Sequence, residues 1–155
     1  MQILERIHFL SRADKLKPVR DAVRVLAQRI GCSHGNIDCM VMAINEACMN
    51  VIQHAYGVKD DGEVILEFWQ DDEDMVIRIH DFAEKIDRQT IRSRDLDDIR
   101  PGGLGVHLIN KMMDSVEYLD GLDGIGNMLQ MRKRLGVVKT SDINCLHDNA
   151  QELGK

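Results

Sequence analysis

The first third of the chain changes from an alternating pattern to a helical one. Residues 2–10 alternate loosely between apolar and polar side chains, which predicts an edge strand. A helix is then predicted to begin at Pro18, a residue favoured in the first turn. The apolar positions that follow keep a helical spacing until Gly31. Ser33 is suited to cap a second helix, which we expect to run to about Tyr56. One strand and two helices are therefore predicted here.

The rest of the chain returns to strand-like patterns. We expect two strands, Glu63–Gln70 and Met75–Phe82, joined by an acidic hairpin turn. A helix, Val106–Met113, follows and is opened by Gly102-Gly103-Leu104-Gly105. Two more strands are expected at Ser115–Leu119 and Met128–Leu135. The densely charged segment Ala83–Pro101 suits a loop. Because the strands come in hairpins, we predict an α+β fold: a two-layer α/β sandwich with a mixed sheet and helices on one face.

Length and composition narrow the class of protein. The 155 residues fit one domain, which we expect to span residues 1–136, with a loosely ordered tail at residues 137–155. The four cysteines show no CxxC spacing, which indicates free thiols in a reducing compartment, so a cytoplasmic location is expected. The charged first residues do not resemble a signal peptide, and no apolar stretch reaches membrane-spanning length.

The balance of charge argues against nucleic-acid binding. The chain has 26 acidic and 20 basic side chains, a net charge of -6, and no long run of lysine or arginine. Binding to a phosphate backbone favours the opposite balance. Aromatic residues make up only 4% of the chain, which also disfavours a base-stacking surface. We therefore expect a protein partner or a small ligand, and neither nucleic acid nor membrane.

The helix expected after Ser33 carries two polar groups on an unusually apolar side. Its main apolar stripe consists of Ile37, Val41, Ile44, Cys48, Ile52 and Ala55. Glu46 and Asn50 lie one turn apart and roughly opposite this stripe, among small and apolar neighbours. A carboxylate and an amide are costly in such a wall unless something satisfies them. The helix alone is equally compatible with solvated or locally bonded side chains and with a binding site.

Three further features follow in a fixed order. Asp81 ends an expected strand, Gly102-Gly103-Leu104-Gly105 opens an expected helix, and Gly126-Asn127 precedes the last strand. A Gly-x-Gly at a helix start leaves backbone N–H groups open to phosphate oxygens, where the helix dipole favours an anion. Each feature alone is more often a cap or a tight turn. Together with the pair on the helix they form a more specific pattern.

In this order the features resemble the GHKL ATPase superfamily, and within it most closely the anti-sigma-factor serine/threonine kinases. The resemblance covers about residues 3–135. It rests on two stretches: Glu46-Ala47-Cys48-Met49-Asn50-Val51-Ile52-Gln53-His54-Ala55-Tyr56, which is similar to the family's asparagine box, and Gly103-Leu104-Gly105-Val106-His107-Leu108-Ile109 followed by Met113-Asp114-Ser115-Val116-Glu117-Tyr118. It implies the Bergerat-type ATP-binding fold.

The resemblance also implies ATP and Mg²⁺ as ligands. By analogy, Asn50 would ligate the metal, since an amide oxygen suits a hard cation, and Glu46 would be the catalytic base. Asp81 would accept a hydrogen bond from the adenine amino group. The backbone of Gly103-Leu104-Gly105 would meet the phosphates, and the segment Ala83–Pro101 would form a lid over ATP.

Two nucleotide-binding positions depart from the family pattern. Ala83 stands where the family usually has a glycine, and its methyl group adds bulk and disfavours a positive φ, which would weaken ATP binding. Asn127 stands where the family usually has a threonine, so the side chain stays polar but loses the hydroxyl.

The function implied by the resemblance is partner switching. The protein would be a homodimeric cytoplasmic kinase that phosphorylates a serine or threonine of an antagonist protein and sequesters a sigma factor while the antagonist is phosphorylated. Two alternatives remain open at this point. One is a protein-binding module of the same fold with weakened catalysis, and the other is a stand-alone sensor-kinase-like ATPase domain that acts on a histidine elsewhere.

Overall fold

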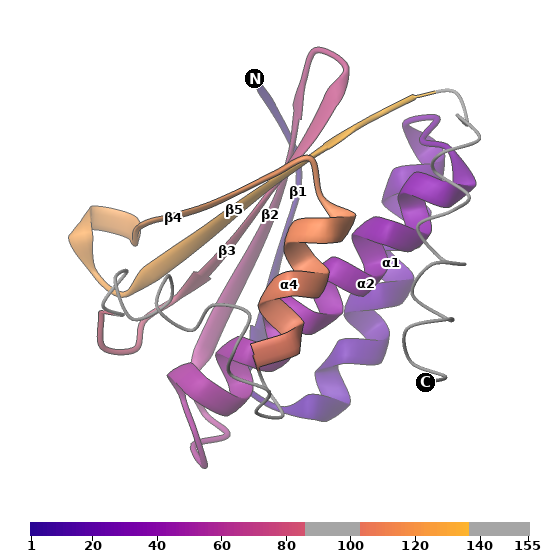
Figure 1. Ribbon diagram of the computed structural model, residues 1–155. Helices are drawn as coiled ribbons and strands as arrows, with labels where there is room; N and C mark the ends of the chain where they lie inside the picture. The colour runs from indigo at the N-terminus through magenta and orange to yellow at the C-terminus, as the bar shows by residue number, and fades with distance from the viewer. Residues whose placement is uncertain (86–102, 137–155) are drawn as a thin grey trace.

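A sheet and a layer of helices make up the structure, a computed structural model that describes residues 1–85 and 103–136 (Figure 1). The sheet contains β1 (Gln2–Leu10), β2 (Glu63–Asp71), β3 (Asp74–Asp81), β4 (Ser115–Asp120) and β5 (Asn127–Arg134). The helix layer contains α1 (Leu16–Arg29), α2 (His34–Asn50) and α4 (Gly103–Met112), which lie together on one face of the sheet. Short helical turns lie at Ala13–Lys15, Val51–Ala55 and Leu122–Gly124. The α+β class and the single helical layer are confirmed.

The sheet order is β1-β2-β3-β5-β4, and every neighbouring pair among these strands is antiparallel. The prediction of a mixed sheet is therefore wrong. The helical hairpin of α1 and α2 returns the chain to the end of the sheet where β1 finished, so β2 runs antiparallel to β1. Strands β3 and β4, on either side of α4 in the sequence, run parallel to each other, but β5 lies between them and pairs antiparallel with both.

Local signals place the helix ends close to where the sequence predicts them. Helix α1 starts two residues before Pro18, which is tolerated because the N–H groups of a first helical turn have no partner within the helix. Gly31 follows the helix with φ +78°, a conformation that favours glycine. Ser33 caps α2 as expected, since its side chain accepts a hydrogen bond from the backbone N–H of Asn36.

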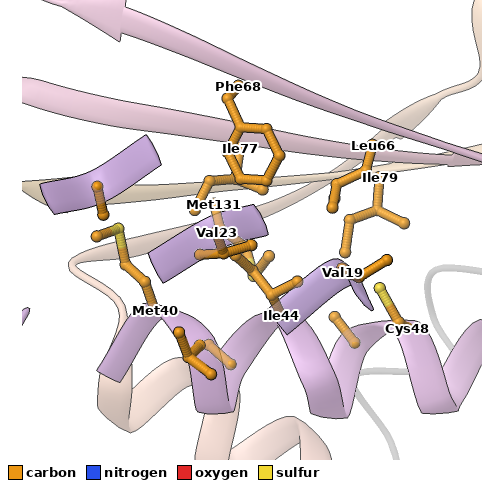
Figure 2. Close-up of a cluster of buried hydrophobic side chains, with 14 of the residues drawn as sticks. Val19, Val23, Met40, Ile44, Cys48, Leu66, Phe68, Ile77, Ile79 and Met131 are labelled. Atoms are coloured by element: carbon orange, nitrogen blue, oxygen red, sulfur yellow. The ribbon is translucent and has the colours of Figure 1, made fainter. Parts of the chain in front are cut away.

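The core lies between the helices and the sheet. Figure 2 shows side chains from α1, α2 and three strands meeting there: Val19, Val23, Met40, Ile44, Cys48, Leu66, Phe68, Ile77, Ile79 and Met131. The stripe predicted on the second helix supplies its share, because Ile37, Val41, Ile44, Cys48 and Ile52 are all buried. Burial of this apolar surface is the main force that fixes α2 over the sheet.

The sheet face away from the helices holds a buried polar cluster. Glu67 accepts hydrogen bonds from Arg6 and Trp69, and His80 lies 3.3 Å from the same carboxylate. Burial raises the pKa of Glu67, but the hydrogen bonds from Arg6, Trp69 and His80 outweigh it and leave that pKa below its usual value. His80 and Asp81 are successive residues of β3, so their side chains point to opposite faces, and Asp81 points toward the helix layer.

Two further predictions can be compared with the described residues. Cys32, Cys39 and Cys48 are buried and form no disulfide, which confirms the expectation of reduced thiols for these three cysteines. Among the described residues, no helix has the length and apolar character needed to cross a bilayer. The expected tail at residues 137–155 lies outside the described residues, and the domain boundary at residue 136 stays a prediction.

Candidate functional site

The carboxyl-terminal end of α2 presents the two polar groups that the sequence singles out. Glu46 and Asn50 lie one helical turn apart, and both are half-buried. Within residues 1–85 and 103–136, neither side chain has a hydrogen-bond partner. Directly after Asn50 the helix widens into a π-helical turn, Val51–Ala55, a local irregularity that is frequent at functional sites. In the part of the chain that the structure describes, a carboxylate and an amide are thus held close together without a partner for either group.

The start of α4 lies directly against this pair. A Cβ atom added to Gly105 would lie 3.1 Å from Glu46 Oε2 and 3.5 Å from both Asn50 Oδ1 and Asn50 Nδ2. Any larger side chain at position 105 would therefore occupy the space in front of both groups. Gly103 is the first residue of α4, and the amino-terminal end of a helix attracts anions. The structure thus brings Glu46, Asn50 and the glycine segment together, and we call these residues the phosphate end.

A second group of predicted residues meets at the ends of β3 and β5. Asp81 and Asn127 are paired across these strands, and Asp81 is buried. Asp81 Oδ1 accepts one hydrogen bond from Asn127 Nδ2 at 2.9 Å and another from the backbone N–H of Ala83 at 3.1 Å. Asn127 Nδ2 also donates to the carbonyl oxygen of Glu84 at 3.0 Å. We call Asp81, Ala83 and Asn127 the base end.

Burial dominates the electrostatics of Asp81. It raises the pKa of the carboxyl group, and the hydrogen bonds from Asn127 and the Ala83 N–H only partly offset this effect, so that the pKa lies above its usual value. One carboxylate oxygen, Oδ1, is already occupied by two N–H groups. The backbone N–H of Asn127 also bonds to this carboxylate and contributes to the partial offset.

Ala83 does not carry the backbone strain that the sequence suggests. Among the described residues, only Asp72 and Asp123 combine a side chain with a positive φ. The expected φ penalty at Ala83 is therefore wrong. Its N–H turns back toward Asp81 in an ordinary conformation that an L-residue adopts freely. The effect of its methyl group on ATP affinity stays a prediction.

Gly126 is required by its position beside Asp81. It has φ +69°, and an added Cβ would lie only 1.9 Å from the carbonyl oxygen of Asp81. No side chain fits there without displacing the end of β3. The glycine before Asn127 therefore brings the two strand ends into close approach.

One contact was missed by the sequence reasoning. The hydroxyl of Tyr56, the residue that closes the asparagine-box motif, donates to the carbonyl oxygen of Glu63 at 2.6 Å and accepts from the backbone N–H of Phe82 at 2.8 Å. The motif includes this tyrosine, but its partners lie seven and 26 residues further along the chain. A periodicity analysis has no means to find such a contact.

The donor set fits magnesium bound together with phosphates. Among the described residues, no group of three or more histidine, cysteine, aspartate or glutamate side chains could hold a metal ion by itself. Mg²⁺ typically takes one or two protein oxygens and completes its shell with phosphate oxygens and water. The Asn50 amide oxygen, with the Glu46 carboxylate one turn away, matches that demand. The remainder of the expected lid, residues 86–101, lies outside the described residues.

Comparison with known proteins identifies a family and several similar sequences. A family model described as a histidine kinase-like ATPase domain matches residues 9–133. A Bacillus cereus (strain Q1) protein named serine-protein kinase RsbW is 29% identical over 117 residues, which are 70% of this chain and 72% of that protein. A protein of the same name from Halalkalibacterium halodurans is 35% identical over 107 residues, 64% of this chain and 65% of that protein.

Solved structures share the fold at low sequence identity. The crystal structure of the RsbU and RsbW domains of a Mycobacterium tuberculosis protein superposes with a TM-score of 0.63 at 16% identity, over 87% of this chain and 34% of that one. The mycobacterial sensor histidine kinase MprB superposes with a TM-score of 0.52 at 12% identity, over 84% of this chain and 96% of that one. At these identities the likeness concerns the fold alone.

Proposed function

We propose that this chain, which belongs to the histidine kinase-like ATPase domain family, binds ATP with Mg²⁺ and transfers the terminal phosphoryl group to a serine or threonine of a partner protein. One observation carries the proposal: Glu46 and Asn50 face Gly105 at the start of α4, and neither side chain has a hydrogen-bond partner among the described residues. The names of the similar proteins, serine-protein kinase, support the choice of acceptor.

The phosphate end would perform the chemistry. Asn50 would hold Mg²⁺, which when bound neutralises charge on the phosphate oxygens. Glu46 would accept the proton of the attacking serine or threonine hydroxyl group, and the oxygen of that hydroxyl group would form a bond to the γ-phosphorus. The bond from that phosphorus to the bridging oxygen breaks, and ADP leaves with the electron pair. Backbone N–H groups of Gly103-Leu104-Gly105 would hold the phosphates in line for this transfer.

The base end would select the nucleotide. Asp81 Oδ1 accepts from Asn127 and the Ala83 N–H, and the carboxylate would use its remaining acceptor capacity for the amino group of adenine. Guanine presents a carbonyl oxygen at that position, which would face a carboxylate oxygen without a proton between them. The proposal therefore includes a preference for ATP over GTP.

Partner switching is the biological role that we propose for this activity. The phosphorylated protein would be an antagonist of the kinase, and the kinase, as a cytoplasmic homodimer, would sequester a sigma factor while the antagonist is phosphorylated. A pull-down from native cytoplasm with and without ATP would identify both partners and show whether each depends on nucleotide. Sedimentation of the purified protein would test the homodimer.

Matched substitutions on α2 test the kinase activity directly. Asn50→Ala and Glu46→Ala should each abolish phosphate transfer to the antagonist. Asn45→Ala is the control, because it removes the same amide group from the same helix at a side chain that accepts from Arg20 instead. Retained transfer in Asn50→Ala would refute the proposed site.

The same assay separates the two alternatives. Capture of a partner without any ATP binding at millimolar nucleotide would indicate a binding module. An acid-labile phosphohistidine product instead of acid-stable phosphoserine or phosphothreonine would indicate a sensor-kinase-like domain.

A further inference from the structure

We propose that Tyr56 is a positioning residue for adenine recognition: its hydroxyl fixes the end of β3, and with it Asp81, relative to the end of the helix that carries Asn50. The inference rests on the proposed function, because it concerns how the same site holds ATP. Tyr56 itself would not touch the nucleotide.

The hydroxyl of Tyr56 joins three elements. Tyr56 follows the π-helical turn that begins directly after Asn50, and its own N–H bonds the carbonyl of Val51. Its hydroxyl donates to the carbonyl oxygen of Glu63, the first residue of β2, and accepts from the N–H of Phe82, which directly follows Asp81. Both bonds are short, at 2.6 and 2.8 Å. A single oxygen atom thus links the end of the asparagine-box helix to the start of β2 and to the residue that follows β3.

The phenol ring is held as well as its hydroxyl. A Cβ atom added to Gly62 would lie 2.4 to 2.6 Å from three carbon atoms of the Tyr56 ring, so the ring rests directly on this glycine. Gly62 is in turn fixed by Ser11, whose Oγ accepts from the Gly62 N–H and whose N–H donates to the Gly62 carbonyl. The ring therefore has little freedom to turn away from Phe82.

The consequence for the site follows from the short path between Phe82 and Asp81. Asp81 is held through Oδ1 by Asn127 from the β5 side, and through the next peptide group by Tyr56 from the helix side. With Tyr56 in place, the carboxylate that would accept from adenine is held relative to the end of the helix that carries Asn50. Without the hydroxyl, the Phe82 N–H and the Glu63 carbonyl lose their partner, and the strand end can shift relative to the helix.

Tyr56→Phe tests this inference because it keeps the ring and removes only the hydroxyl. We expect ATP affinity to fall by about threefold to tenfold, the range of one or two net hydrogen bonds, with kcat at saturating ATP unchanged. Purine riboside triphosphate lacks the 6-amino group. Its affinity should therefore fall less than that of ATP in Tyr56→Phe, and the ratio of the two affinities should decrease. Tyr118→Phe is the control, since the Tyr118 hydroxyl on β4 has no hydrogen-bond partner among the described residues.

Gly62→Ala provides a second, independent variant. The added methyl group would displace the Tyr56 ring, so the preference for ATP over purine riboside triphosphate should decrease here too. Gly136→Ala is the control, because the added carbon has open space around it. In an Asp81→Asn background, Tyr56→Phe should have no further effect on the preference.

Two results would overturn the inference: equal losses of both nucleotides in Tyr56→Phe, or wild-type affinity for both. A wild-type protein that binds ATP and transfers phosphate would keep the proposed function in either case. A wild-type protein that binds no ATP would refute both.

Discussion

The two ends of the candidate site differ in how the fold treats their polar groups. At the phosphate end, Glu46 and Asn50 are half-buried, and among the described residues they bond to nothing. At the base end, Asp81 is buried and already accepts two hydrogen bonds from Asn127 and Ala83. One end consists of groups without a partner among the described residues, and the other of a group whose hydrogen bonds also join two strand ends.

Under the proposed function, this difference separates the residues that would perform the phosphate transfer from those that would recognise the nucleotide. A side chain without partners among the described residues can be changed with little consequence for the fold, so substitutions of Glu46 should alter the rate of transfer and leave the stability unchanged. A buried carboxylate that ties two strands together cannot be changed without altering both nucleotide affinity and stability. The comparison therefore predicts which quantity each substitution changes.

The largest effect is expected for Glu46→Gln at the phosphate end. The amide keeps the size of the side chain but cannot accept the hydroxyl proton, so kcat should fall by about 10²–10⁴-fold. The affinity for ATP and the free energy of unfolding should stay at wild-type values. Single-turnover phosphate transfer and calorimetric titration with ATP measure the two quantities. An unchanged kcat would remove Glu46 from the mechanism.

Asp81→Asn should have the next largest effect, on affinity rather than on rate. The amide oxygen can keep the bonds from Asn127 and the Ala83 N–H, which turns the new NH₂ group toward the adenine amino group. Loss of a charge-assisted hydrogen bond of about 1.5–3 kcal/mol corresponds to roughly 10–100-fold weaker ATP binding. Because the new donor matches a carbonyl, the ratio of ATP to GTP affinity should also fall. An unchanged ratio would contradict the assignment of the base end.

The features that the sequence predicts correctly are mostly local. Short-range sequence patterns are sufficient to predict the Ser33 cap, the hairpin of β2 and β3, and the buried stripe of α2. Glu46 and Asn50 were found because helical spacing alone places them on one side. The sequence also located Asp81 and Asn127, but through the family resemblance and not through their contact.

What the sequence could not predict is non-local. No periodicity indicates that β5 inserts between β3 and β4, so the expected mixed sheet is antiparallel. The bonds from Tyr56 to Glu63 and Phe82 depend on a π-helical turn and on the approach of three elements, none of which has a local sequence signature. The sequence likewise did not indicate that Ala83 avoids a positive φ while its N–H donates to Asp81.

Two glycines test whether the base end is coupled to the fold. Gly124 and Gly126 both have positive φ, +74° and +69°, but an alanine Cβ meets nothing at position 124 and lies 1.9 Å from the Asp81 carbonyl oxygen at position 126. Gly124→Ala should therefore cost only the backbone strain, about 1–2 kcal/mol of unfolding free energy, with normal ATP affinity. Gly126→Ala should cost more and should weaken ATP binding as well. Equal behaviour of the two variants would show that the strand ends are not coupled.

The smallest effect is expected in the pH dependence of stability. The folded-state pKa of Asp81 lies above its usual value, chiefly because of burial. The unfolded state therefore loses this proton first as the pH rises, and wild-type stability falls between the unfolded pKa of about 3.9 and the raised folded pKa.

Asp81→Asn removes this titration, so at pH 7 the variant should unfold at a higher temperature than the wild type although it binds ATP less well. The difference should shrink as the pH falls toward 4, because the wild-type carboxyl group then also begins to bind its proton in the unfolded state. Thermal unfolding from pH 4 to 8 without nucleotide measures this trend, with Asp60→Asn, an exposed carboxyl group in a loop, as the control. A variant less stable than the wild type at pH 7 would mean that the bonds at Asp81 outweigh the burial of its charge, so that recognition and stability favour the same residue.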